Sequence, residues 1–211
     1  MKIKILLNII ILIIFSLNYS LAAINNSIVA KIGDKIITSL DVENEIRTIL
    51  IITKQELNQK NVENTKGYAV KSLIRTTLKR SEIEKFKITV FNEVDLEKYL
   101  NGIAIELNLE KNDLKDFFQT NGLNYKIFKE KYKTELLWNT LIFSLYQSQI
   151  TINNIDLEQE LSKALKNNQN MEIDKEKIRE KIIEKQKSEK LNLFSRSHYS
   201  TLENTILINF K

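Results

Sequence analysis

Apolar residues recur at three- and four-residue intervals along most of this chain, a spacing that predicts amphipathic α-helices. The clearest stripes belong to a helix that ends near Ile52 and to a longer helix over residues 67–86. The polar stretch between them, residues 54–66, is interpreted as a loop. Further helices are expected near residues 92, 114, 125, 157 and 174. The predicted fold class is therefore mainly α, with about six to seven helices.

Both ends of the chain depart from this helical pattern and predict short strands. Residues 28–32 and 35–37 flank Gly33-Asp34, a two-residue connection typical of a β-hairpin. The last apolar run, residues 205–210, is rich in β-branched residues and too short for a stable helix. Because an isolated hairpin is marginal in water, we expect the C-terminal strand to pair with this hairpin and join the two ends of the chain.

Residues that cap helices support the predicted helix starts. Thr38 and Asp41 have the spacing of a capping box, in which each side chain bonds the backbone amide of the other residue. Gly122 is well placed to end a short helix in the left-handed conformation. Asn124 can cap the next helix, which is expected to run from Tyr125 to about Gln149 and to be apolar on more than one face. Such a helix must be covered on several sides.

The first residues have the pattern of a secretory signal. Lys2 and Lys4 precede the apolar stretch 5–15, and the small residues at 20–23 offer a cleavage site. The apolar stretch is shorter than the roughly 20 residues of a membrane-spanning helix, and an uncleaved anchor is the alternative interpretation. We expect residues 1–23 to be a signal peptide and the mature chain to lie outside the cytoplasm without stable membrane insertion.

Composition narrows the class of protein. Hydrophobic residues make up 43% of the chain and charged residues 28%, as in ordinary globular domains. Four glycines and no proline favour long helices, and the absence of cysteine excludes thiol catalysis and cysteine-based zinc sites. Without Lys2 and Lys4, 30 basic residues face 27 acidic ones. Because this small positive excess is spread along the chain, we expect no nucleic-acid partner.

No combination of residues in the sequence predicts an enzyme active site. The single histidine, His198, is interpreted as a surface or helix-end residue, because no second histidine or cysteine could complete a metal site or a catalytic triad. Acidic pairs such as Glu158 with Glu160 are typical of solvated helices. A phosphate-binding loop motif is missing from the sequence. We expect neither enzyme activity nor a metal or cofactor.

Two segments carry motifs in the order found in a known family. Residues 28–42 combine the predicted hairpin with the first capped helix, and residues 121–125 combine the glycine-capped turn with the start of the long helix. Together with Phe128, Tyr132 and residues 150–152, they resemble the SurA family of periplasmic chaperones. The resemblance is good over roughly residues 27–165 and continues in the right order over 175–211. It implies a helical chaperone core whose last strand joins the N-terminal hairpin.

One departure from the family pattern changes the expected activity. Members usually insert one or two parvulin-type prolyl-isomerase domains before the closing helix, where this chain has only a polar connector, residues 167–173. The four glycines and the single histidine do not supply the glycine-rich scaffold and histidine pair of a parvulin site. We therefore divide the chain into a signal peptide (1–23), a SurA-like N-terminal chaperone region (24–166), this connector, and a C-terminal helix and strand (174–211) that complete the same module.

The resemblance implies an ATP-independent holdase of the periplasm. Its clients would be unfolded or nascent outer-membrane polypeptides, and the outer-membrane assembly machinery is a further expected partner. Aromatic side chains are the candidates for a client groove, although each is alternatively part of a packed core: Phe117, Phe118, Tyr125, Phe128, Tyr132, Trp138 and Phe143. A prolyl isomerase of parvulin descent and a non-catalytic scaffold subunit of the cell envelope are the alternative functions.

Overall fold

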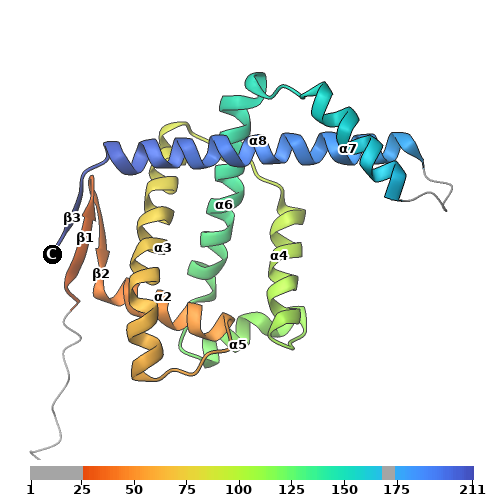
Figure 1. The fold of residues 1–211 in the computed structure, drawn as a ribbon. Coiled ribbons are helices and arrows are strands. Elements are labelled where there is room, and N and C mark those ends of the chain that lie inside the picture. The colour runs from red at the N-terminus through yellow and green to blue at the C-terminus, as the bar shows by residue number, and fades with distance from the viewer. Residues whose placement is uncertain (1–25, 168–173) are drawn as a thin grey trace, which may run out of the picture.

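The computed structural model describes residues 26–167 and 174–211, which form seven α-helices and one three-stranded antiparallel sheet (Figure 1). This confirms the predicted fold class. The expected signal peptide and residues 168–173 of the expected connector lie outside the described residues. The elements are β1 (Ile28–Ile32), β2 (Lys35–Thr38), α2 (Ser39–Ile52), α3 (Gln59–Lys85), α4 (Glu93–Glu106), α5 (Leu114–Thr120), α6 (Tyr125–Tyr146), α7 (Asn154–Asn167), α8 (Lys175–Thr205) and β3 (Ile208–Phe210).

The sheet joins the two ends of the described chain, as predicted. β1 lies in the centre, between β2 and β3, and Lys31 pairs with Ile36 on one side and with Asn209 on the other. Gly33 opens the turn between β1 and β2 with a φ of +57°, as a two-residue hairpin with glycine at its first turn position requires. The C-terminal strand therefore provides the third strand that an isolated hairpin lacks.

The helices form a frame beneath the long helix α8 (Figure 1). α8 has 31 residues and so is roughly 46 Å long. One half of α8 crosses the ends of α3 and α6, and its other half packs against α7 beyond α4 (Figure 1). α4 lies on the side of α6 opposite α3, and α2 and α5 cross the lower ends in this view. The last helix thus connects the sheet at one end of the molecule with α7 at the other.

Four apolar clusters hold this frame together. The first lies between the sheet, α2 and α3 around Leu50, and the second lies between α4, α5 and α6 around Phe118. The third joins α3, α6 and α8 around Trp138, and the fourth joins α7 to α8 around Leu161. Because α6 contributes to both the second and the third cluster, the prediction that this helix is covered on several sides is confirmed.

The prediction of a loop over residues 54–66 was wrong in its second half. α3 begins at Gln59, where the side chain of Asn58 accepts a hydrogen bond from the backbone amide of Asn61 at 2.9 Å. The polar residues that suggested a loop lie mainly on the solvent face of this first part of α3, whereas Val62 and Thr65 face inward. A single apolar residue in two helical turns was too weak a periodic signal.

The predicted caps are present at the other helix ends. Thr38 and Asp41 form the reciprocal capping box at the start of α2. Gly122 has a φ of +70° after α5, and the side chain of Asn124 accepts hydrogen bonds from two backbone amides at the start of α6. These caps satisfy backbone groups that would otherwise lack partners at the helix ends.

Candidate functional site

Three of the seven candidate aromatic residues lie in the packed interior. Phe118 and Phe128 are buried in the second cluster, with ring centroids 4.4 Å apart. Trp138 is fully buried in the third cluster, and its indole N–H donates to the Ser195 hydroxyl at 2.7 Å. In the described fold these three side chains therefore serve as core residues that fix α6 against α5 and α8.

The other four candidates are wholly or partly accessible. Phe117, Tyr125 and Tyr132 are partly buried at the margin of the second cluster. Phe143 is 50% exposed and belongs to none of the four clusters. Contact of any candidate with a client polypeptide remains a prediction, and the accessible candidates are those that could make it.

Partly accessible apolar and aromatic side chains lie where α4 meets α6 and along one face of α6, where the exposed Asn139 separates Leu136 from Phe143. We define this α4–α6 surface by five residues: Phe91, Tyr99, Tyr132, Leu136 and Phe143. The rings of Tyr99 and Tyr132 contact one another where the two helices meet, with centroids 3.7 Å apart. Phe91, Tyr132 and Leu136 pack on the second cluster. Residues 132, 136 and 143 are four and seven positions apart on α6, so they lie on one face of that helix.

Two of the five side chains on this surface are titratable phenols, and the Lys133 ammonium lies 5.5 Å from the centre of the Phe91 ring. Burial is the main cause that raises the pKa of Tyr99, and hydrogen bonding to Tyr132 adds to it. Burial also raises the pKa of Tyr132, and the nearby carboxylates of Glu45 and Glu135 act in the same direction. Both phenols therefore remain protonated at neutral pH. They offer a ring face and a neutral hydroxyl, which suits contact with apolar and aromatic side chains.

Local sequence explains how Phe91 and Tyr99 reach the surface, although we did not predict either residue as part of a site. Phe91 directly precedes Asn92, the N-cap of α4, and packs in the same cluster as Leu96, four residues into the helix. This is the arrangement of a hydrophobic staple, which fixes how the chain enters a helix. The staple pattern could have identified Phe91. Tyr99 lies beside the buried stripe of α4 and carries no comparable signal.

Two interhelical ion pairs near the α4–α6 surface hold α6 against α2 and α3. Lys131 pairs with Glu45 of α2, and Lys79 of α3 pairs with Glu135. Glu45 and Lys79 are themselves buried. A buried charge that loses its partner is strongly unfavourable, so each pair restrains the position of α6. The α6 side of the α4–α6 surface therefore belongs to a helix that two ion pairs hold in place.

The interpretation of His198 as a surface or helix-end residue was wrong. Its side chain is largely buried where α8 crosses α3 and α6. Nδ1 lies 2.8 Å from the Tyr146 hydroxyl, and Nε2 lies 3.3 Å from a carboxylate oxygen of Glu82. The helix crossing, which the sequence pattern does not specify, encloses the ring. These contacts describe a polar joint between three helices rather than a metal or catalytic site.

A groove lies beside the start of β1. We call this the β1–α2 groove, and its volume is about 520 Å³. Its apolar lining comes from β1, α2, the α2–α3 connection and α3: Val29, Val42, Ile46, Leu57 and Val62. Its polar lining residues include Glu43 and Arg47, which form an ion pair at 2.7 Å. The groove is of the size that accommodates one or two large apolar side chains.

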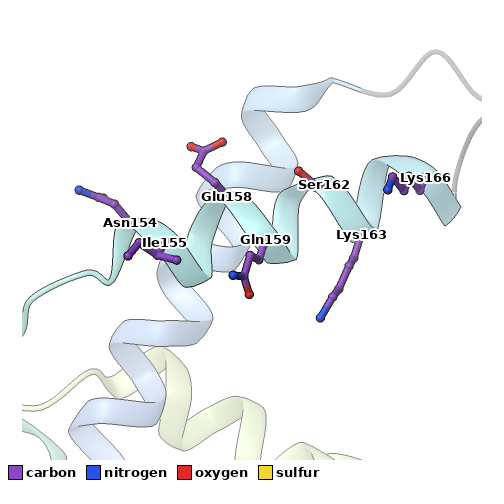
Figure 2. A pocket seen from close by; sticks show the side chains of 7 residues that line it. All are labelled: Asn154, Ile155, Glu158, Gln159, Ser162, Lys163 and Lys166. Atoms are coloured by element: carbon purple, nitrogen blue, oxygen red, sulfur yellow. The ribbon is translucent and has the colours of Figure 1, made fainter.

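A second hollow lies on the outer face of α7. It measures about 640 Å³, and its seven described lining residues, Asn154, Ile155, Glu158, Gln159, Ser162, Lys163 and Lys166, all come from this one helix (Figure 2). In Figure 2 the side chains of Glu158 and Lys163 point away from each other rather than toward a common centre. These residues form an open helix surface without convergent chemistry.

Neither a metal-binding cluster nor a membrane-spanning helix is present in residues 26–167 and 174–211. Within these ranges, no three residues of the types His, Cys, Asp and Glu are grouped so that they could hold a metal ion. No helix in these same ranges is both long enough and apolar enough to span a bilayer. The α4–α6 surface and the β1–α2 groove each combine apolar side chains from several elements, and both suggest binding of another polypeptide.

Comparison with solved structures gives only weak similarity. No protein-family model matches the chain, and no curated protein matches it. A solved structure from Campylobacter jejuni is 12% identical and covers 88% of this chain and 99% of its own chain, with a TM-score of 0.43. It comes from work describing the virulence factor PEB4 and the periplasmic protein Cj1289 as two structurally related SurA-like chaperones. A similarity this low identifies neither a family nor a function.

Proposed function

We propose that this chain is an ATP-independent holdase that binds unfolded polypeptides through the α4–α6 surface. The observation that carries the proposal is a set of apolar and aromatic side chains, from Phe91 to Phe143, left partly accessible where α4 meets α6 and along the same face of α6. Exposed apolar patches on folded proteins commonly mark sites that bind another protein. Its two tyrosines are neutral at neutral pH, and three of its five residues lie on α6, which two ion pairs hold in place.

The sequence resemblance to the SurA family supports the finer parts of the proposal. It favours the periplasm as the location, nascent outer-membrane proteins as the clients, and the outer-membrane assembly machinery as a further partner. The expected signal peptide, residues 1–23, agrees with that location. On this proposal residues 24–166 and 174–211 act as one chaperone module.

The size of the surface favours weak and reversible binding. If a client covers about 200 Å² of apolar area, burial contributes roughly 5 kcal/mol at about 25 cal/mol per Å². The client loses conformational freedom when it is held, and this cost offsets much of the gain. Release then needs no nucleotide, because a client that folds or moves to another partner is no longer bound.

Suppression of aggregation by residues 24–211 tests the proposal. The protein is mixed at equal molar ratio with an unfolded outer-membrane protein diluted from urea, and light scattering is recorded. Phe143→Lys is the informative variant, because Phe143 is half exposed and packs in no cluster, so its loss leaves the fold intact. Ile155→Lys, at an exposed apolar position on α7, is the matched control.

The proposal predicts protection by the wild type and Ile155→Lys and reduced protection by Phe143→Lys. A well-folded wild type that gives no protection would refute the holdase function. Equal protection by both variants would place the client site elsewhere on the molecule. A protease-coupled prolyl-isomerisation assay tests the enzymatic alternative, which gains support only if a point mutation abolishes the measured catalysis.

A further inference from the structure

The strand β3 leaves one edge of the sheet without a partner strand among the described residues. Asn209 pairs with Lys31, the Lys211 amide donates to the Val29 carbonyl, and the Gly33 amide donates to the Leu207 carbonyl. In an antiparallel pair, hydrogen-bonded and non-hydrogen-bonded residues alternate. The N–H and C=O groups of Ile208 and Phe210 therefore point away from β1, toward the open edge.

Side chains along this edge alternate between the two faces of the sheet. Ile208 and Phe210 pair with Ile32 and Ala30, so they lie on the core face of the sheet, and Phe210 is nevertheless 66% exposed. Leu207, Asn209 and Lys211 lie on the opposite face, and all three are exposed. A strand added to this edge would be favoured if it were apolar on the core face and polar or acidic on the other.

The β1–α2 groove lies close to the same edge. Val29 accepts a hydrogen bond from Lys211 and also lines the groove. The register of β1 shifts between Ile28 and Ala30, and an irregularity of this kind re-aims the side chain at its centre, which is Val29. One neighbourhood therefore combines backbone groups that have no partner strand among the described residues, an exposed aromatic ring and an apolar groove.

We propose that an extended client segment with alternating apolar and polar residues pairs with β3 as a fourth strand. Backbone pairing provides affinity for many sequences, and alternate side chains contacting Phe210 and the groove provide selectivity. Transmembrane β-strands of outer-membrane proteins have this two-residue alternation. The inference rests on the proposed holdase function and adds a second point of client contact, distinct from the α4–α6 surface.

Phe210→Pro tests the pairing without removing a native backbone bond. Proline lacks the N–H group, and the N–H group of residue 210 points away from β1, so the bonds of Asn209 and Lys211 to β1 are kept. Phe210→Val keeps the outward N–H group and is the matched control. The probe is a fluorescently labelled ten-residue peptide of alternating valine and threonine with one glutamate. A second peptide is N-methylated at alternate residues along one edge.

Fluorescence anisotropy should show tighter binding of the unmethylated peptide to wild-type protein. Phe210→Pro should weaken that binding about tenfold, the factor expected for roughly one net hydrogen bond, while Phe210→Val should stay within about threefold of wild type. Amide exchange followed by NMR should show that the peptide slows exchange at Ile208 and Phe210 of the wild type. Because amide exchange is measured on the wild type, it tests strand pairing even if Phe210→Pro folds poorly.

Unchanged affinity of a folded Phe210→Pro variant, or unchanged amide exchange at Ile208 and Phe210, would overturn the edge-pairing inference. The holdase function would still stand if the wild type suppressed aggregation and Phe143→Lys did not. Failure of the wild type to suppress aggregation would refute the holdase function instead, and the peptide assay would still decide on strand pairing.

Discussion

Replacing Gly33 by alanine is predicted to weaken the hairpin that closes the fold. The φ of +57° at this turn costs a residue with a Cβ atom about 1–2 kcal/mol. The added Cβ would meet the Ile206 Cγ2 atom at 3.9 Å, an ordinary contact, so no steric clash increases this cost. Alanine also restricts the unfolded chain more than glycine does, which offsets about 0.4–1 kcal/mol of this cost. The expected net loss is therefore about 1 kcal/mol of unfolding free energy.

Gly67→Ala is the matched control, and it is expected to change the unfolding free energy in the opposite direction. Gly67 lies on the exposed face of α3, and apart from adjacent residues and the backbone of its own helix, no atom lies within 4 Å of the Cβ position. Alanine in a helix interior is favoured over glycine by about 1 kcal/mol, so this variant should be more stable than the wild type.

Urea unfolding measures both changes, and the fluorescence of Trp138 reports on them because it is the only tryptophan and is fully buried. With an m-value of about 2 kcal/mol per M, the midpoint should fall by about 0.5 M for Gly33→Ala and rise by a similar amount for Gly67→Ala. Midpoints that move in the same direction would refute the assigned backbone conformations.

Three further predictions concern the packing around α6 and the start of α3. Lys131→Met leaves the buried carboxylate of Glu45 without its partner and should cost about 3 kcal/mol in urea unfolding, most of it recovered when Glu45→Leu is added. Asn58→Ala removes the N-cap of α3 and should lower the unfolding free energy by about 1 kcal/mol. The helical circular dichroism signal of the folded protein should decrease only slightly, because the rest of α3 stays folded. Because the pKa values of Tyr99 and Tyr132 are raised, their contribution to stability is complete below the ordinary pKa near 10 and is lost as pH rises through the folded-state values. The unfolding free energy measured in urea should therefore fall above pH 10, and less steeply in the Tyr99→Phe, Tyr132→Phe double variant.

Periodicity and capping residues were sufficient to predict most of the fold. The box of Thr38 and Asp41, the left-handed Gly122 and the cap Asn124 are local signals, and each depends on residues within a few positions. Pairing of the two chain ends followed from the instability of a lone hairpin. The first two turns of α3 were missed because the tertiary contacts of Val62, rather than local periodicity, hold them in place.

The candidate site was harder to predict, because exposure of an aromatic residue depends on which helix packs against it. Trp138 and Phe143 are five positions apart on α6, yet Trp138 is fully buried and Phe143 is half exposed. The difference arises because α8 crosses α6 over Trp138, and a sequence pattern does not specify that crossing. The same crossing buries His198, which the sequence alone suggested to be exposed.

Site-specific photo-crosslinking tests the central claim most directly. A photoreactive residue is placed at position 143 on the α4–α6 surface or at position 155 on the outer face of α7, both exposed in the free protein. Each protein is then irradiated with an unfolded outer-membrane protein or with the same protein after folding. Strong crosslinks at position 143 to the unfolded form alone, with few at position 155, are the predicted result. Equal crosslinking at the two positions, or none at position 143, would contradict the account.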